Sequence, residues 1–456
     1  MRGRDTGDRR PTRRAVGVFA VLAVLLVLAG CSGGSSNSKL TVGLAGSTAD
    51  HPSQPPQIAA KGPDGAYAFV YDNQIWLHKQ GQTASTQLTH LVLSNGATLR
   101  WGPLVWSHSG TFIAFALSEN LTPTQPDRST GPLYYVDTST GTTYSTSGTG
   151  SVNGHTYDWL GDGMLFYATG GGVMMYNPGE PSHDSRVWQI LTPFTKQFTA
   201  PNTDYYAGAN TTYGDLAVDG GRLFFTQFTL ATLGATGQVG TATLEEMSLG
   251  TVDTSWDTSA IQSWLTAGFP APAQVANLGV AYANARGDVA TGAWAVNLDQ
   301  NGNGVLVRQQ ILGVDTTAGA VTSSFCVLQN GNNLNPYSFY GCGASPILQA
   351  AGKQPIAAQS NLSVSPDGKR VAFSADALYI QNMDGNGAAK VENVGWATAP
   401  SWSADGAHVF VTQLVKETTD ASGVRRDQTN VLWTDAGATS QALISGAQNL
   451  AWSNAG

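Results

Sequence analysis

A short motif recurs along this chain and constrains its fold more than any other feature. It is an apolar residue or Trp, then Ser-x-Asp-Gly, then an alternating apolar run, and its clearest copies span Leu362–Ser374 and Ser401–Thr412. Weaker copies stand at 61–69, 105–115, 158–166, 216–225 and 282–290, and residues 450–456 match the start of an eighth. Asp-Gly favours the tight turn of a β-hairpin because glycine takes a positive φ without steric cost. The motif therefore predicts a series of hairpins.

The spacing of the copies indicates the architecture. Their turn glycines are 38 to 81 residues apart, and each hairpin is followed by a second apolar run such as Leu378–Ile380, a further turn and a short outer strand. Four strands at a period of roughly 40 to 50 residues are typical of propeller blades, which must stack on neighbours to bury both faces. We predict an all-β fold: a single β-propeller over residues 57–456, built of four-stranded antiparallel blades, seven in number, with six or eight as alternatives.

Details of the ring follow from the same repeat. The run Ala451-Trp452-Ser453 is expected to complete a blade begun by the N-terminal part, and Trp106, Trp402 and Trp452 are expected to pack between blades. Insertions grouped toward the rims are expected at 119–129, 176–213, 231–272 and 329–354. Within the third of these, Asp257–Leu265 is interpreted as a short helix with Asp257 as its N-cap.

The copies Ser365-Pro-Asp-Gly368 and Trp402-Ser-Ala-Asp-Gly406 resemble the repeat of TolB-like β-propellers. The resemblance covers roughly residues 57–456, strongly in the last hundred and faintly between 210 and 350. It implies a fold and not an activity. No Trp-Asp dipeptide ends the blades, in contrast to WD repeats, and about 25 residues before the first blade leave no counterpart to the N-terminal domain of TolB itself.

The N-terminus has the pattern of an export signal. Six arginines stand among the first fourteen residues, and an apolar run from Ala15 to Gly30 ends on Leu28-Ala-Gly-Cys31, which resembles a lipobox. We predict a bacterial lipoprotein signal peptide at 1–30, lipidation of Cys31, a flexible tether over 31–56, and a cell-membrane protein facing away from the cytoplasm. An ordinary signal peptide or a single membrane helix is the alternative, and export by the general or the twin-arginine route stays open.

Charge and cysteine content bound the partners. Without residues 1–30, which hold six arginines and two aspartates, the chain keeps 17 basic and 29 acidic residues, a net charge of −12. Such a surface does not suit a phosphate backbone, so no nucleic-acid partner is predicted. Cys326 and Cys342 flank an Asn/Gly-rich loop, and we predict a disulfide that closes it, with two free thiols as the alternative.

Few residues suggest chemistry. Asp299, Asn301 and Asn303 match the first half of a calcium loop, but its twelfth position is Gln310, so a polar turn is the alternative and neither a metal nor a cofactor is predicted. The seven histidines form no paired zinc motif. Aromatic residues outside the repeat are candidates for a binding face or for small local cores: Tyr205, Tyr206, Tyr213, Trp256 and Trp264.

These observations favour a non-enzymatic, membrane-tethered binding or scaffold module of the cell envelope, with an envelope protein or polysaccharide as its partner. The alternatives are a carbohydrate-active or lyase-type propeller enzyme and a substrate-capture component of an envelope transport system. Carboxylates and a histidine converging at one mouth of the channel would favour an enzyme. The sequence names candidates for such a cluster but does not place them: His155, Asp158, Asp215 and Asp288.

Overall fold

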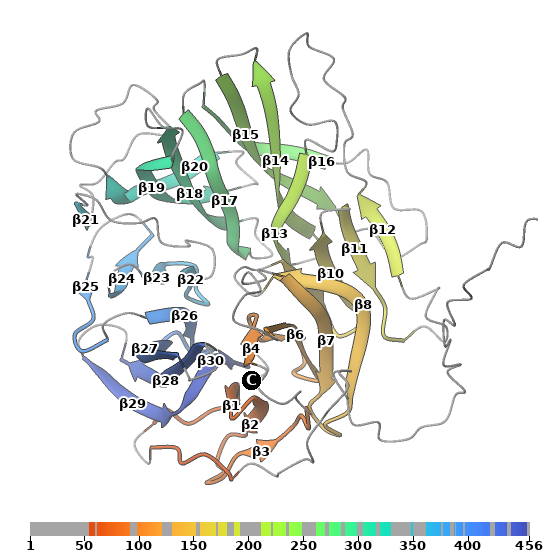
Figure 1. Ribbon diagram of the computed structural model, residues 1–456, viewed down its shortest axis with the longest axis vertical. Coiled ribbons are helices and arrows are strands. Elements are labelled where there is room, and N and C mark those ends of the chain that lie inside the picture. Colours follow the sequence, from red (N-terminus) through yellow and green to blue (C-terminus); the bar gives the residue numbers. More distant parts are fainter. Residues whose placement is uncertain are drawn as a thin grey trace, which may run out of the picture. The chain divides into compact units, whose positions relative to one another are not determined.

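The computed structural model describes residues 54–453 with gaps, the longest at 192–210, 249–260, 330–347 and 350–361. The described residues contain thirty strands and no helix, and all belong to one compact unit (Figure 1). Their strands form seven sheets, and the strand pairs of the described residues are antiparallel apart from β20 with β21. The prediction of an all-β fold of antiparallel sheets is confirmed, whereas Cys31 and the predicted signal peptide lie outside the described residues.

The first three sheets come from the N-terminal half and from the end of the chain. Sheet 1 has the order β3 (Thr86–Gln87), β2 (Gln74–His78), β1 (Tyr67–Tyr71), β30 (Ala447–Trp452). Sheet 2 has the order β4 (Thr98–Trp101), β6 (Phe112–Asn120), β7 (Thr130–Asp137), β8 (Thr143–Ser151), and β5 (Val105–Trp106) also pairs with β6. Sheet 3 has the order β12 (Val187–Leu191), β11 (Gly172–Tyr176), β10 (Met164–Thr169), β9 (Tyr157–Leu160).

The other four sheets follow the chain. Sheet 4 consists of β13 (Thr211–Asp219), β14 (Arg222–Leu233), β15 (Gly237–Ser248) and β16 (Ile261–Phe269). Sheet 5 consists of β17 (Ala273–Ala283), β18 (Asp288–Leu298), β19 (Gly304–Asp315), β20 (Ala320–Gln329) and β21 (Leu348–Gln349). Sheet 6 consists of β22 (Leu362–Val364), β23 (Arg370–Ser374), β24 (Leu378–Asn382) and β25 (Ala389–Lys390). Sheet 7 consists of β26 (Ala397–Trp402), β27 (Val409–Thr419), β28 (Arg425–Thr434) and β29 (Ser440–Ser445).

The two ends of the described chain meet in sheet 1. Strand β30 pairs with β1, so that Tyr67 lies opposite Trp452 and Tyr71 opposite Ala447. Three strands of this sheet therefore come from the N-terminal part and one from the C-terminus. The expected pairing of the run around Trp452 with the N-terminal part of the chain is confirmed.

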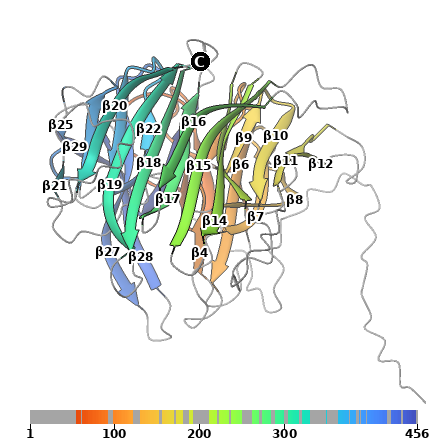
Figure 2. The same cartoon turned by 90° about the horizontal axis from the view of Figure 1, so that it is seen from above.

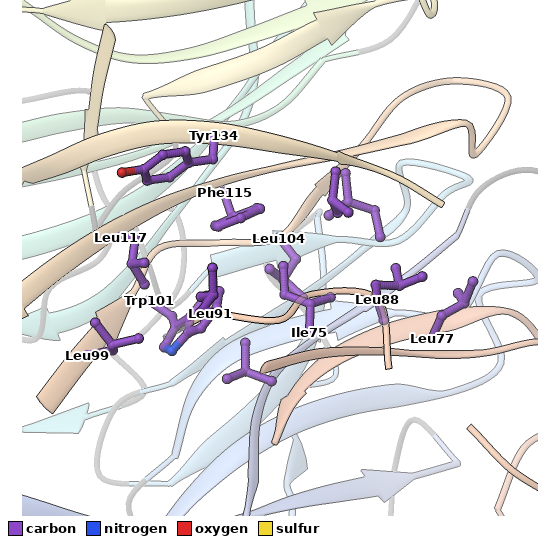
Figure 3. Close-up of a cluster of buried hydrophobic side chains, with 14 residues drawn as sticks. Ile75, Leu77, Leu88, Leu91, Leu99, Trp101, Leu104, Phe115, Leu117 and Tyr134 are labelled. Atoms are coloured by element: carbon purple, nitrogen blue, oxygen red, sulfur yellow. The ribbon is translucent and has the colours of Figure 1, made fainter. Parts of the chain in front are cut away.

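The hydrophobic core lies between neighbouring sheets, because successive residues of a strand point to opposite faces. In β6, Ile113 and Phe115 pack with residues of sheet 1, in the cluster drawn in Figure 3. Ala114 and Ala116 of the same strand pack with Tyr157 and other residues of sheet 3. Burying a side chain such as Phe115 contributes about 1.5–3 kcal/mol. Similar clusters join sheets 3 and 4, sheets 6 and 7, and sheets 7 and 1.

Each sheet has one strand that lies beside the corresponding strand of the next sheet. These are β30, β5, β9, β13, β17, β22 and β26, called here the first strands. Strand β5 lies beside β9, β9 beside β13, β13 beside β17, β17 beside β22, β22 beside β26, and β26 beside β30. Between β30 and β5, the indole nitrogen of Trp106 donates a hydrogen bond to the Ala451 carbonyl over 3.1 Å.

Two sequence predictions are wrong in sheet 4. Residues 261–265 of the segment interpreted as a helix belong instead to strand β16, which pairs with β15 along most of its length. More than half of the insertion expected at 231–272 also consists of strand, from β14, β15 and β16, and β12 and the start of β13 lie within the one expected at 176–213. Pairing with a neighbouring strand here overrides the local pattern, and β14 and β15 are long strands rather than loops (Figure 2).

The turn glycines follow the prediction only in part. Gly110, Gly368 and Gly406 have φ of 76°, 71° and 69°, as a tight turn requires. Gly65 and Gly163 do not have positive φ, and in sheet 3 the turn uses Gly161, with φ of 58°. In sheet 3 the hairpin of β9 and β10 is thus kept, but the residue that allows the turn is shifted.

Candidate functional site

The Ser-x-Asp-Gly turns use their polar side chains internally. Ser365 is fully buried, and its hydroxyl donates to Asp367 Oδ1 over 2.6 Å and accepts the backbone N–H of Arg370 over 2.9 Å. In the next sheet, the Ser403 hydroxyl makes the same two bonds, to Asp405 and from the backbone N–H of His408. The serine therefore closes the turn, and the aspartate orients the serine.

These hydrogen bonds also stabilise the ionised carboxylates. The Ser365 hydroxyl is the main cause that lowers the pKa of Asp367 below its ordinary value, and the Ser403 hydroxyl does the same for the pKa of Asp405. A general acid or base needs a pKa near the working pH. These aspartates are anions held in turns, so their geometry fits a structural role.

The tryptophans of the repeat form hydrogen bonds between the first strands of neighbouring sheets. The indole nitrogen of Trp159 donates to the Val105 carbonyl over 3.2 Å, and that of Trp402 donates to the Ser363 carbonyl over 3.0 Å. Trp106 makes the equivalent bond to Ala451. Each carbonyl lies on a strand edge that no further described strand pairs with, so the indole gives this backbone group a donor that the sheet does not supply. The prediction that Trp106 and Trp402 pack between sheets is confirmed.

The first strands β26 and β30 share a bulge three residues before the Trp of the motif. Ala399 and Asn449 occupy this position, both with φ of 51°, and the pairing register shifts beside each. A non-glycine residue in this left-handed region costs roughly 1 kcal/mol or more. At Asn449 the conformation is compensated by hydrogen bonds, since its backbone N–H reaches Thr412 Oγ1 and its Nδ2 donates to the carbonyls of Trp101 and Gly102. Asn449 thus joins sheets 7, 1 and 2.

The acids singled out in the sequence lie at different places. Asp158 stands on β9, where Oδ2 accepts the backbone N–H of Val218 from β13 over 2.7 Å and Oδ1 accepts the N–H of Trp159. Asp215 lies at the register shift of β13, and Asp288 begins β18. Asp158 therefore joins two sheets. His155 lies outside the described residues.

Most of the other candidate residues also lie outside the described part: Tyr205, Tyr206, Trp256, Asp299, Asn301, Asn303 and Cys342. Tyr213 and Trp264 lie on strands β13 and β16, so their placement in inserted loops is wrong. Cys326 lies on β20, opposite Gln310 of β19. The disulfide thus stays a prediction, and the choice between a calcium loop and a polar turn at 299–303 lies outside the described residues.

Within the described part of the chain, no three His, Cys, Asp or Glu side chains are grouped so that they could hold a metal ion. His408 Nδ1 lies 3.0 Å from Asp435 Oδ1, and this carboxylate is 72% exposed. An ion pair so open to water contributes little. No helix among the described residues is long and apolar enough to cross a membrane.

A two-stranded ribbon extends from sheet 7. The pairing of β27 with β28 runs from Val409 to Thr419, whereas β26 pairs with β27 only as far as Gln413 and β29 pairs with β28 only from Asn430 onward. Among the described strands, residues 414–419 and 425–429 therefore pair only with each other. At 3.3 Å per residue this ribbon extends about 20 Å beyond its neighbours. At its base, Val415 lies at a register shift and is 53% exposed.

The sequence reasoning missed two residues that hold neighbouring sheets together. Asn449 is one, and Arg370 is the other: its guanidinium lies 4.7 Å from the ring centre of Trp402 and donates to the Gly406 carbonyl. Arg370 follows the Ser-Pro-Asp-Gly turn by two residues, so its position in the motif could have signalled it. Asn449 stands three residues before Trp452, but the same position in the copy before it is Ala399, so the repeat gave no such signal.

Comparison with known proteins identifies no family for this chain. No family model matches the chain, and no curated protein matches it. Similar solved structures include a eukaryotic initiation factor, with 10% identity, TM-score 0.41, and coverage of 88% of this chain and 93% of that one. Prolyl oligopeptidase B from Galerina marginata has 11% identity and TM-score 0.41 over 84% of this chain, which spans 48% of that protein. A putative TolB from Agrobacterium tumefaciens has 9% identity and TM-score 0.33, covering 86% and 95%. Likenesses this weak carry no argument about function.

Proposed function

We propose that this chain is a membrane-anchored, extracytoplasmic lipoprotein whose TolB-like β-propeller binds a partner in the cell envelope. The anchor is Cys31, with residues 1–30 as signal peptide and residues 31–56 as tether. The propeller covers residues 57–456. The observation that carries the binding role is the ribbon of β27 and β28, which has an exposed apolar residue at its base and two edges that pair with no other described strand.

The propeller is a single closed ring of seven blades. Seven sheets, the succession of neighbouring first strands and the pairing of β30 with β1 support this arrangement. Side chains such as Trp159 and Asp158 hold the sheets together, because they form hydrogen bonds with backbone groups of the neighbouring sheet. Such a ring is a rigid frame, and the ribbon projects from it as an element available for contacts.

The ribbon favours a protein partner. Its edge strands expose backbone N–H and C=O groups, which pair readily with an added strand. Lys416 and Gln428 lie opposite each other in the ribbon and are both exposed, so polar side chains flank these edges. An envelope protein that offers an extended segment satisfies both the backbone edge and the apolar contact at Val415.

The anchor is tested by Cys31→Ser in the native host. The wild-type protein should incorporate labelled palmitate and stay with the membrane fraction. The variant should incorporate none and should be found uncleaved or released. Palmitate labelling of the variant together with membrane retention would show that the anchor is not at Cys31.

The binding role is tested by a photo-crosslinking amino acid at Gln428 of the ribbon, in the lipidated protein in intact cells. The matched control carries the same group at Gln82, an exposed residue in the turn after β2. We expect a discrete crosslinked protein at Gln428 and not at Gln82, identified by mass spectrometry. The same products at both sites, or none at either, would contradict the proposed contact.

A further inference from the structure

A column of four aromatic rings holds the C-terminal strand in place. His78 of β2 stacks on Tyr67 of β1 with ring centres 4.7 Å apart, and Tyr67 stacks on Trp452 of β30 at 5.3 Å. Trp452 in turn stacks on Phe410 of β27 at 5.0 Å. The column therefore crosses from sheet 1 into sheet 7 at the place where the two ends of the described chain meet.

His78 is the member of this column that can change its charge near neutral pH. It is 6% exposed, and its Nδ1 is buried with no hydrogen-bond partner. A protonated imidazole carries an N–H at both ring nitrogens. Protonation of His78 therefore places both a positive charge and an unpaired donor inside the packed interface.

The groups around His78 do not offset this cost. The segment before β1 contributes Asp64, and β1 contributes the buried phenol of Tyr67. Strands β3 and β30 have no ionisable side chains. Burial lowers the pKa of His78 below its ordinary value, and the opposing effect of the Asp64 carboxylate is smaller.

We infer that His78 makes the attachment of strand β30 to β1 sensitive to acid. Above about pH 6.5 the imidazole is neutral in both the closed and the open chain, and the column is stable. As the pH falls below that value, the open form binds a proton more readily than the closed form, so opening becomes more favourable. This property concerns the closure of the fold and is independent of the partner that the ribbon binds.

The test is hydrogen exchange of the full-length lipidated protein in detergent, followed by mass spectrometry of peptides from β1 and β30. After correction for intrinsic exchange, the opening constant of these strands should rise by up to about tenfold for each pH unit below 6.5 in the wild type. His78→Phe keeps a ring in the column but cannot be protonated, so its opening constant should not change with pH over this range.

Two further variants complete the test. His90→Phe, at an exposed histidine just beyond β3, should keep the wild-type pH dependence. His78→Gln supplies a second uncharged side chain if His78→Phe does not fold. The inference is overturned if both His78 variants show the wild-type pH dependence, or if wild-type exchange in β30 is the same at pH 7.5 and pH 5.5.

Discussion

Replacing the serine of a Ser-x-Asp-Gly turn by alanine should destabilise the protein by more than the loss of one hydrogen bond, because the hydroxyl makes two. In Ser365→Ala, the Asp367 carboxylate loses a donor at 2.6 Å, and the Arg370 N–H loses its acceptor at 2.9 Å. A hydrogen bond to a charged group contributes roughly 1.5–3 kcal/mol, and leaving a buried donor unpaired costs about 1–3 kcal/mol. Because Asp367 is exposed and water can partly replace its lost donor, we expect the free energy of unfolding to fall by about 3 kcal/mol.

The same reasoning applies to Ser403→Ala, because the Ser403 hydroxyl makes equivalent bonds to Asp405 and to the His408 N–H. The assay is equilibrium unfolding in urea followed by circular dichroism, with Ser445→Ala as the control at an exposed position of β29. A loss of 3 kcal/mol lowers the folding equilibrium constant by about a hundredfold. If both turn variants differ from the wild type by no more than Ser445→Ala does, the role assigned to the turn serines is wrong.

Three further predictions follow from individual positions. Gly65→Ala should cost about 1–3 kcal/mol of stability, since its Cβ would overlap the Trp452 indole, whereas Gly163→Ala, with open space around it, should be close to neutral in the same thermal melt. Ala399→Gly should raise stability by about 1 kcal/mol because it relieves a φ of 51°; a lower melting temperature would contradict this. Asp367 has its pKa lowered in the fold, so it contributes stability that is present above about pH 4 and is lost as the pH falls below that value; an Asp367→Asn variant should therefore lose less stability than the wild type between pH 5 and pH 3.

The repeat predicted the fold best where its turn chemistry is complete. The copies at Ser365 and Ser403 carry every residue that closes the turn, so their hairpins could be placed to the residue. Sheet 4 was interpreted poorly because its strands exceed the usual blade length, and β14 and β15 have twelve residues each. Ile261, Trp264 and Leu265 have helical spacing, yet β15 supplies a pairing partner for this segment. The local pattern of apolar residues cannot show which strand will pair with such a segment.

Contacts between sheets were less predictable than the sheets themselves. The Trp residues of the motif were expected to pack between blades, but not to donate to a particular carbonyl of the preceding first strand. Asn449 reaches carbonyls of residues that precede it by 347 and 348 positions. Such a partner follows from the pairing of β30 with β1 and not from any local property of Asn449.

The most direct measurement of the central claim, a ring closed by the C-terminal strand, is a disulfide crosslink between β1 and β30. Ala68 and Ala451 lie opposite each other in the register of these strands. In a variant with Cys31, Cys326 and Cys342 replaced by serine, Ala68→Cys with Ala451→Cys should crosslink under mild oxidation and hold the terminal fragments together after proteolysis. The control pair, Ala68→Cys with the exposed Ala407→Cys in the turn of sheet 7, should not. Absence of the crosslink from the first pair, or equal crosslinking in both, would contradict the closed ring.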